Sequence, residues 1–468
     1  MKNVLVTGAT GFIGRPLTLH LLDEGYQVTV LAREPASARD LAARGARVIP
    51  GNLTVSTSFD KVIEEVDGLF HLAALTDGDH HVADLRRVNI IGTRNVLDAA
   101  SRAGVERVVY CGCTSSLGDT GGETRDESHD HDGSFSSVAE VTKQGAHRLV
   151  EKRMSDGEPI VNAVVSTAYG PGDQGVVGDL IGHHLAGLAL AHLNRCAGLT
   201  LTHVDDVAVG LRLAYERGEV GERYLIADTP ATYGQFFEHL ADQTGISEPR
   251  TQLPDWLGDV LPGLTKRLAP LSADGAVALR SSLVQLRRTT RFYSGAKARQ
   301  ELGWSPRGLR QGLRDTLPWY RRREQQAADR MLQSTAVPLL GMTLFDIGLG
   351  LAALAFPKMY VDLMHPHEGG LHLPAARSLL ARTGLLWLFF AFVQGMAGSD
   401  PVKRPEWVLI AGALRLMDVP ADIGYALTSD DKSALGKAGL IAAPVFNLSI
   451  GSLLAYAGYR GLRAKLSR

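Results

Sequence analysis

The sequence predicts an α/β domain that is followed by four apolar helices. Three observations support this prediction. A short apolar strand, a glycine-rich turn and a helical pattern follow one another directly at the start of the chain, and further strand and helix patterns alternate up to about residue 325. From about residue 336 the sequence becomes much more apolar. With 468 residues, the chain is also too long for one ordinary domain.

The composition argues against several classes of function. A net charge of -1 provides no basic field for nucleic acid, so no nucleic-acid partner is predicted. The three cysteines, Cys111, Cys113 and Cys196, lack the paired spacing of a zinc site or a disulfide framework, and the loop with His129 and His131 lacks a zinc-like spacing. We therefore predict no metal site and a reducing, cytosolic setting. The chain enters a strand at once, so no signal peptide is predicted.

The first strand, residues 4–6, leads into the turn TGATGFIG at residues 7–14 and then into a helix. This order is typical of dinucleotide-binding sites, in which the start of the helix binds the phosphates. Gly8 allows the tight turn, Gly11 lets the backbone approach a pyrophosphate, and Gly14 permits close packing of helix on strand. The predicted cofactor-binding residues of the turn are Gly8, Thr10, Gly11, Phe12, Ile13 and Gly14.

The end of the second strand indicates which dinucleotide binds. Residues 27–31 form this strand, which ends in Ala32 and Arg33. A site that selects NAD usually has a carboxylate here, which binds the ribose hydroxyls and repels a 2′-phosphate. Arg33 can instead pair with that phosphate. We therefore expect NADP(H) as the favoured cofactor and NAD(H) as the alternative. The plainer interpretation of Arg33 is a solvated surface arginine.

Further segments continue the alternation and carry a family resemblance. Strands are predicted at residues 68–72 and 105–110, and a helix opens at residues 88–93. Later motifs are YGPGD at 169–173, THVDDVA at 202–208, SGAKA at 294–298 and LGWSP at 302–306. In this order they resemble the extended, or atypical, short-chain dehydrogenase/reductases, the superfamily of sugar-nucleotide epimerases, dihydroflavonol reductases and 3β-hydroxysteroid dehydrogenases.

The resemblance covers about residues 1–325 and implies a Rossmann-type doubly wound parallel sheet, with a small substrate subdomain interleaved from about residue 165. The substrate cleft is then expected at the carboxyl ends of the strands. The resemblance also places Ala73, Ala74 and Asn89 among the cofactor-binding residues. A homodimer is compatible with it.

The same resemblance exposes a gap in the catalytic residues. In this superfamily a Tyr-x-x-x-Lys pair transfers the proton, and a Ser or Thr at the end of the preceding strand holds the substrate oxygen. The lysine lowers the pKa of the tyrosine and binds the nicotinamide ribose. The lysine corresponds to Lys143, but the tyrosine position is Ala139 and the hydroxyl position is Cys113. Thr114 or Ser115 can supply the hydroxyl after a shift of one or two residues.

Several functions remain open without the tyrosine. One is a reductase or dehydrogenase acting on a CH–OH or C=O group, which recruits another acid such as Tyr169, His147, a substrate group or a water. Another is reduction of a C=C or C=N bond, which needs no such tyrosine. A third is a degenerate scaffold or sensor that keeps the dinucleotide in a membrane complex. An epimerase on a lipid-linked or nucleotide sugar is disfavoured, because Val164 and Val165 replace the family's arginine-proline pair.

After a basic linker at residues 326–335, four apolar segments predict a transmembrane domain over residues 336–468. Each segment is long enough to cross about 30 Å of hydrocarbon as a helix. The predicted spans are about 336–356, 378–396, 407–428 and 438–458. Lysines and arginines gather before the first span, between the second and third, and after the fourth. This pattern predicts a multi-pass membrane protein with the first domain and both termini in the cytoplasm. The alternative is a soluble four-helix bundle.

Ionisable residues fall inside or near these spans: Asp346, Arg382, Arg415, Asp418 and Asp422. Such groups usually face the interior of a bundle and pair there. Because Arg415 and Asp418 are one helical turn apart, the plainer interpretation is an internal salt bridge that holds the bundle. The alternative is a polar site for a lipid headgroup or a quinone-like ring.

The predicted association with a lipid bilayer indicates that the substrate is lipophilic. An enzyme whose substrate partitions into the membrane gains effective concentration from being tethered there. We therefore predict an oxidoreductase for a lipophilic small molecule, such as a sterol, an isoprenoid or a prenylated quinone- or quinolone-like compound. The apolar stretch 253–286 is expected either to form a lid or to pack within the substrate subdomain.

Overall fold

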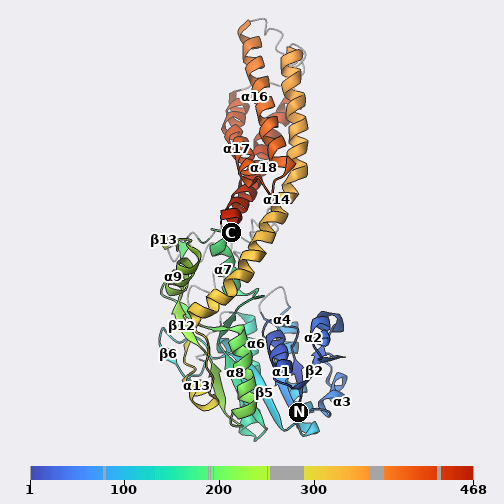
Figure 1. Cartoon of the computed structure of the whole chain (residues 1–468), viewed down its shortest axis with the longest axis vertical. Coiled ribbons are helices and arrows are strands. Elements are labelled where there is room, and N and C mark those ends of the chain that lie inside the picture. Colours follow the sequence, from blue (N-terminus) through green and yellow to red (C-terminus); the bar gives the residue numbers. More distant parts are fainter. Residues whose placement is uncertain are drawn as a thin grey trace. The chain divides into compact units, whose positions relative to one another are not determined.

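The computed structural model divides the chain into two units. An α/β unit contains Met1–His184 and Leu188–Trp319, and a helical unit contains Leu185–Gly187 and Tyr320–Arg468 (Figure 1). The residues that the structure describes are 2–76, 81–131, 133, 135, 137–187, 189, 191–192, 194–249, 251–252, 289–357, 374–428 and 434–466. The apolar stretch predicted at 253–286 lies outside them.

The centre of the α/β unit is a seven-stranded parallel sheet with the order β11-β7-β5-β4-β1-β2-β3. Its strands are β1 Asn3–Thr7, β2 Gln27–Ala32, β3 Arg47–Pro50, β4 Gly68–His71, β5 Arg107–Cys113, β7 Ile160–Val165 and β11 Arg223–Ile226. The strand order reverses between β1 and β4, as in doubly wound sheets. The predicted Rossmann-type fold is confirmed.

Helices cover both faces of the sheet (Figure 1). One face carries α1 (Gly14–Asp23) and α8 (Val204–Arg217), and the other carries α5 (Thr93–Ala103) and α6 (Val138–Ser155). Strand β1 is apolar at successive positions because both faces of the sheet are buried. Val4 and Val6 pack in the core on the α1 and α8 face, and Leu5 packs in the core on the α5 and α6 face. This part also contains α2 Arg39–Ala43, α3 Asp60–Ile63, α4 Val82–Arg86, a π-helix Arg87–Gly92 and three short 3-10 helices, Pro35–Ala38, Ser56–Ser58 and Thr114–Ser116.

A smaller subdomain is interleaved with the last strands of the sheet. Its three-stranded sheet has the order β12-β10-β8, and β11 of the large sheet comes between β10 and β12 in sequence. Its elements are β8 Thr167–Tyr169, α7 Val176–Leu185, β10 Gly198–His203, β12 Thr229–Thr232 and α9 Tyr233–Thr244. Two short pairs, β6 Thr124–Arg125 with β14 Phe292–Tyr293 and β9 Ala191–His192 with β13 Thr251–Gln252, complete it. Helix α13 (Ala296–Leu302) packs instead in the first core of the large sheet, beside α8. Elements of the small sheet and of the large sheet thus alternate along the chain after β7, and the assignment of the small sheet to substrate binding stays a prediction.

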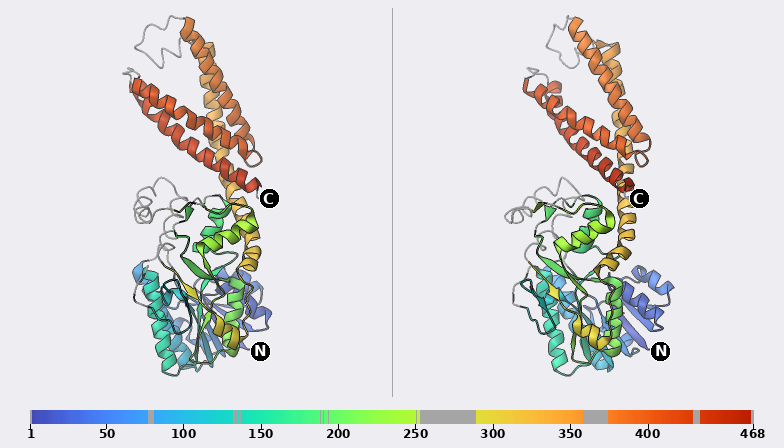
Figure 2. Two further views of the ribbon diagram at one scale, coloured as in Figure 1. Left: turned by 90° about the vertical axis from the view of Figure 1, so that its left-hand side faces the viewer. Right: turned by 60° about the vertical axis from the view of Figure 1, so that its left-hand side comes forward.

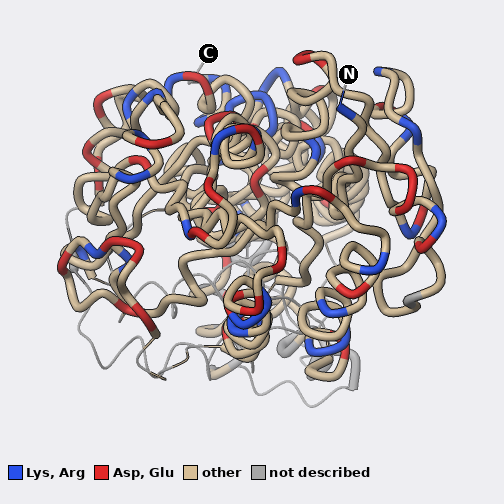
Figure 3. Tube along the Cα trace, turned by 90° about the horizontal axis from the view of Figure 1, so that it is seen from below, with Lys and Arg blue, Asp and Glu red and all other residues tan. Residues whose placement is uncertain are grey.

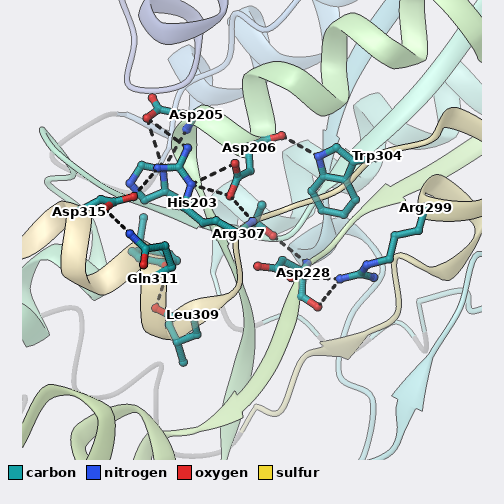
Figure 4. A network of polar contacts seen from close by, with 12 residues as sticks. His203, Asp205, Asp206, Asp228, Arg299, Trp304, Arg307, Leu309, Gln311 and Asp315 are labelled. Atoms are coloured by element: carbon teal, nitrogen blue, oxygen red, sulfur yellow. Dashed lines mark hydrogen bonds and ion pairs between the residues drawn. The ribbon is translucent and has the colours of Figure 1, made fainter. Parts of the chain in front are cut away.

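Two of the family motifs form a structural network (Figure 4). Arg307 donates from Nε to both carboxylate oxygens of Asp206, at 3.1 and 3.0 Å, and from Nη1 to Asp315 at 2.8 Å. Trp304 donates its indole N–H to the backbone oxygen of Asp206 at 2.8 Å. These contacts fix the segment between α13 and the start of α14 (Leu309–Ala355) against α8. Basic and acidic residues are also mixed across the α/β unit (Figure 3), in line with the low net charge.

His71, at the end of β4, joins three elements inside the α/β unit. Its Nδ1 lies 2.7 Å from the hydroxyl of Thr7 on β1, and its Nε2 lies 2.9 Å from the hydroxyl of Thr93 on α5. The ring is fully buried, and burial lowers the pKa of His71 to about 4. The imidazole is therefore neutral at physiological pH and serves as a hydrogen-bonding strut.

Replacing His71 with asparagine is expected to reduce the sensitivity of the protein to acid. Between the ordinary pKa of 6.5 and the folded value of about 4, only the unfolded chain binds the proton, so stability is present above pH 6.5 and falls as the pH drops toward 4. These values correspond to a loss of about 2 kcal/mol between pH 7 and pH 5. Thermal unfolding of both proteins at the two pH values tests this, and an equal loss in the variant would contradict it.

The helical unit consists of α14 beyond Trp319, α16 (Pro374–Ser399), α17 (Pro405–Thr428) and α18 (Ala434–Leu466). Each predicted span falls on one of these helices, and the predicted linker at 326–335 lies inside α14. Among the described residues, two stretches, Leu309–Ala355 and Leu380–Ser399, are long and apolar enough to cross a membrane. Helix α17 carries Arg415, Asp418 and Asp422, which lower its apolar character. Membrane association thus rests on two helices, fewer than the four predicted.

The four helices pack as two pairs, α14 with α16 and α17 with α18 (Figure 2). Close approach explains the glycines at these contacts. A Cβ on Gly350 of α14 would lie 2.9 Å from the backbone oxygen of Gly384 on α16, and a Cβ on Gly412 of α17 would lie 2.3 Å from the backbone nitrogen of Ala455 on α18. Small residues at such crossings let the helix backbones come together.

Candidate active site

A cavity of about 400 Å³ opens at the carboxyl ends of β1, β2, β4, β5 and β7. It lies where the strand order reverses, which is the usual position of a ligand site in such sheets. The predicted site residues that line it are Gly8, Thr10, Gly11, Phe12, Ile13, Gly14, Arg33, Ala73, Ala74, Cys113 and Lys143. The sheet therefore brings most of the predicted site together.

The glycine turn forms one end of the cavity. Gly8 has a φ of +77°, a left-handed conformation that favours glycine. A Cβ on Gly14 would lie 2.1 Å from the backbone oxygen of Gly8, so α1 can start this close to β1 only with glycine at that position. Gly11 donates its backbone N–H to Gly8 at 3.0 Å, which closes the turn. The result is a backbone cradle in front of the first amides of α1, the geometry that binds phosphate.

Arg33 follows β2 at this end of the cavity and has Asn52 and Leu53 as neighbours in the lining. Asn52 and Leu53, which follow β3, and Ser166, which follows β7, also line the cavity and were not predicted from the sequence. Their sequence positions could have predicted them, because all three residues follow closely after the carboxyl end of a parallel strand. Asn52 uses its side-chain oxygen to accept from the backbone and hydroxyl of Thr54, at 3.1 and 3.0 Å.

Asn89, a predicted cofactor-binding residue, does not line the cavity. It is buried on the π-helix. Its amide accepts from the backbone nitrogen of Leu75 at 2.7 Å and donates to the backbone oxygen of Leu75 and to the hydroxyl of Thr142, at 3.0 and 2.9 Å. Asn89 thus connects the cavity wall that contains Ala73 to α6, and it holds this wall in place without lining the cavity.

Lys143 of α6 meets the end of β5 at the opposite side of the cavity, where Cys111 and Cys113 also line it. Burial is the main cause that raises the pKa of the Cys111 thiol to about 12, and the nearby charge of Lys143 opposes this shift. The sulfur of Cys113 lies 3.0 Å from the hydroxyl of Ser115, so a hydroxyl is present beside the expected position. Ala139 is buried and is not part of the lining.

Ser115 and the other predicted hydroxyl and acid groups are not among the residues that line the cavity. Thr114 is buried. Tyr169 is 1% exposed and donates its hydroxyl to the backbone oxygen of Leu309 at 3.4 Å, away from the cavity. Burial raises the pKa of Tyr169. His147 faces Asn162 and is likewise outside the lining. These positions give no support to Tyr169 or His147 as the replacement acid.

The sequence and the fold of this chain are similar to those of known proteins. Residues 4–227 match the NAD dependent epimerase/dehydratase family. A putative dihydroflavonol 4-reductase of Synechocystis sp. is 32% identical over 67% of this chain and 93% of its own length. The chain belongs to the NAD dependent epimerase/dehydratase family. A 4-hydroxy-2-methyl-3-oxo-4-farnesyl-3,4-dihydroquinoline-1-oxide ketoreductase of Stigmatella aurantiaca is 31% identical over 67% of this chain and 94% of its own. The crystal structure of gox2253 matches 69% of this chain and 99% of its own, with 29% identity and a TM-score of 0.59.

Membership of the NAD dependent epimerase/dehydratase family identifies the chain as a nicotinamide-dependent enzyme of the oxidoreductase type. The residues present fit such a dinucleotide, because the glycine cradle has no room for side chains and Lys143 lies at the far end of the same cavity. The departure from the catalytic pattern lies at Ala139 and Cys113.

Proposed function

We propose that the protein is a membrane-anchored, NADP(H)-dependent oxidoreductase for a lipophilic ketone, alcohol or conjugated ring. The observation that carries this proposal is that one cavity is lined both by Arg33, which follows β2, and by Lys143, which lies near Cys111 on β5, two strands beyond β1. Arg33 supplies a cation where a 2′-phosphate would lie. Lys143 supplies a cation where the nicotinamide ribose would lie.

The chemistry follows from the groups at the Lys143 end. The dinucleotide, when bound, supplies or accepts the hydride. Lys143 orients the ribose, and Cys113, which lines the cavity and contacts the Ser115 hydroxyl behind it, donates its thiol hydrogen to the substrate oxygen. Because Ala139 has no acidic proton, the proton comes from the substrate or from a water in the cavity. A conjugated C=C substrate places the smallest demand on such a donor.

The surface of the helical unit supports the membrane anchor. Leu344, Phe345 and Met417 are 72%, 65% and 73% exposed, whereas the polar Asp346 and Gln394 are 1% and 2% exposed. A water-soluble bundle has the opposite distribution, with apolar side chains inside. In a bilayer the apolar side chains face lipid and the polar ones face the interior. We propose that all four helices span the membrane, with the α/β unit and both termini in the cytoplasm.

The lipophilic substrate is supported from two directions. A similar protein is named as the ketoreductase of a farnesyl-bearing quinoline oxide, a ring ketone with an isoprenoid chain. An anchor in the bilayer also raises the effective concentration of a substrate that dissolves there. Together these observations favour sterols, isoprenoids and prenylated quinone- or quinolone-like compounds over soluble sugars.

Turnover by the full chain in detergent tests this proposal. The protein is expected to consume NADPH, followed by its absorbance, when it is given one member of a panel of sterol ketones, isoprenoid ketones and prenylated quinones. The same panel with a nucleotide sugar provides the comparison. Consumption with the sugar alone would contradict the lipophilic substrate.

A dinucleotide-binding scaffold or sensor is the second candidate, favoured by the presence of Ala139 and Cys113 at two catalytic positions. The two candidates differ in one measurement. Tight dinucleotide binding with no turnover across the whole panel would select the scaffold, because a scaffold needs the glycine cradle but no proton donor.

Replacing Arg33 with serine is expected to weaken NADPH binding by about tenfold to a hundredfold, because a charge-assisted hydrogen bond to the 2′-phosphate is lost. NADH binding should change by no more than about twofold, since NADH lacks that phosphate. Fluorescence titration of both nucleotides measures the ratio. Arg39→Ser, a change of an exposed arginine on α2 that does not line the cavity, is the matched control. Equal losses for both nucleotides would rule out this role of Arg33.

A further inference from the structure

Three polar side chains from three different helices meet in the interior of the helical unit. Arg415 of α17 donates from Nη2 to Oδ2 of Asp346 on α14 at 2.5 Å, and Gln394 of α16 donates from Nε2 to the same oxygen at 3.0 Å. The side chains of Arg415 and Asp346 are 8% and 1% exposed. The salt bridge predicted between Arg415 and Asp418 on one helix is thus replaced in the structure by a pair between helices.

This group has unused hydrogen-bonding capacity. The side-chain oxygen Oε1 of Gln394 and the nitrogen Nε of Arg415 are both buried, and neither has a hydrogen-bond partner in the described part of the chain. One atom is an acceptor and the other is a donor. A buried polar atom without a partner is costly, so pairs of this kind are normally satisfied by a ligand or a water.

We infer that Asp346, Gln394 and Arg415 form a binding site for the hydroxyl group of a lipophilic alcohol. A hydroxyl has both a donor for Gln394 Oε1 and an acceptor for Arg415 Nε. A carbonyl or an ether can only accept, and an ammonium group can only donate. A carboxylate would bring a second negative charge next to Asp346. The hydroxyl is therefore the group that complements both atoms.

The surroundings indicate that the rest of the ligand is hydrocarbon. Met342, Val393 and Ala411 lie within one turn of the three polar residues, on the same helices, and belong to one buried apolar cluster. The ring of Phe390 lies 5.9 Å from the guanidinium carbon of Arg415, which shields that side of the cation. An isoprenoid or sterol alcohol has this combination of one hydroxyl and an apolar body.

This inference rests on the proposed function and makes it more specific, because the reduction of a lipophilic ketone yields a lipophilic alcohol. The site lies near the middle of the first predicted span, at 336–356, so it would take up an alcohol from the bilayer. Of the proposed substrate classes, the alcohol is therefore the one that we expect the helical unit to bind.

Photolabelling of the full chain in detergent without dinucleotide tests the inference. The probe is a fifteen-carbon isoprenoid alcohol with a diazirine and an alkyne, and its methyl ether and its hydrocarbon are matched probes. We expect the alcohol to label peptides of α14, α16 and α17 about tenfold more than either matched probe, because only the alcohol satisfies both buried atoms. Equal labelling by all three probes would overturn the inference, since it would show a purely apolar surface.

A pair of variants supports the assignment of residues. Gln394→Leu removes the acceptor and should lower alcohol labelling to about the level of the ether. Thr343→Val is the control, because the Thr343 hydroxyl donates to the backbone of Leu339 on its own helix at 2.8 Å, and labelling should stay unchanged. Because the probes compare ligands on the wild-type chain, the test does not depend on the folding of a variant. Turnover without alcohol-selective labelling would overturn this inference alone, whereas alcohol-selective labelling without turnover would overturn the proposed oxidoreductase alone.

Discussion

Replacing Lys143 with methionine is expected to lower NADPH-dependent turnover by about a hundredfold to ten-thousandfold at saturating cofactor. Methionine has nearly the same length, so the packing of α6 is kept while the cation is lost from the cavity. The effect should be large because Ala139 leaves Lys143 as the matched residue of the catalytic Tyr-x-x-x-Lys pair. The rate of NADPH consumption with the best panel substrate measures this loss.

A second lysine on the same helix provides the control. Lys152 is 71% exposed in its side chain and pairs with Asp156 at 2.8 Å on the surface of α6. Lys152→Met should leave turnover within about twofold of wild type, since exposed pairs contribute little. Retention of more than about a tenth of the turnover by Lys143→Met would show that Lys143 takes no part in the chemistry.

Replacing Gly14 with alanine is expected to abolish dinucleotide binding and to destabilise the α/β unit by about 1–3 kcal/mol. The added Cβ would lie 2.1 Å from the backbone oxygen of Gly8 and 2.8 Å from Cα of Ala9, and both are backbone atoms that cannot rotate away. Helix α1 must therefore move away from β1, and its first amides leave the phosphate position. Nucleotide titration and thermal unfolding measure the two effects.

Gly341 on α14 is the matched control, because a Cβ there meets no atom within 4 Å. Gly341→Ala should bind the dinucleotide like the wild type, and the helix should gain up to about 1 kcal/mol from the better helix former. Normal binding by Gly14→Ala would mean that the glycine cradle is not the phosphate site.

Local patterns were sufficient to predict the cofactor half of the site. Gly8, Gly14, Arg33 and Lys143 each follow from a short stretch of sequence, a turn after a strand or a helix motif. In the structure these four residues line one cavity, because parallel strands place their carboxyl ends along the same edge of the sheet. Asn52 obeys the same rule, but the short strand β3 before it was not predicted.

Residues whose role depends on distant partners could not be predicted in this way. Tyr169 stands in a family motif, yet its hydroxyl reaches Leu309, a residue 140 positions later. Asn89 contacts Thr142, 53 positions later, and this contact links the cavity wall to α6. Sequence spacing contains no information on such contacts, because they depend on how elements pack.

In the helical unit, too, some features followed from the sequence and others only from the tertiary structure. The sequence by itself determined where the apolar helices lie and that ionisable residues interrupt them, because helix length and hydropathy are local properties. Only the tertiary structure decided that Arg415 pairs with Asp346, 69 positions away, and not with Asp418 on its own helix. Burial is the physical reason. A charge inside a bundle must be satisfied by whatever side chain a neighbouring helix presents, and helix packing alone decides which residue that is.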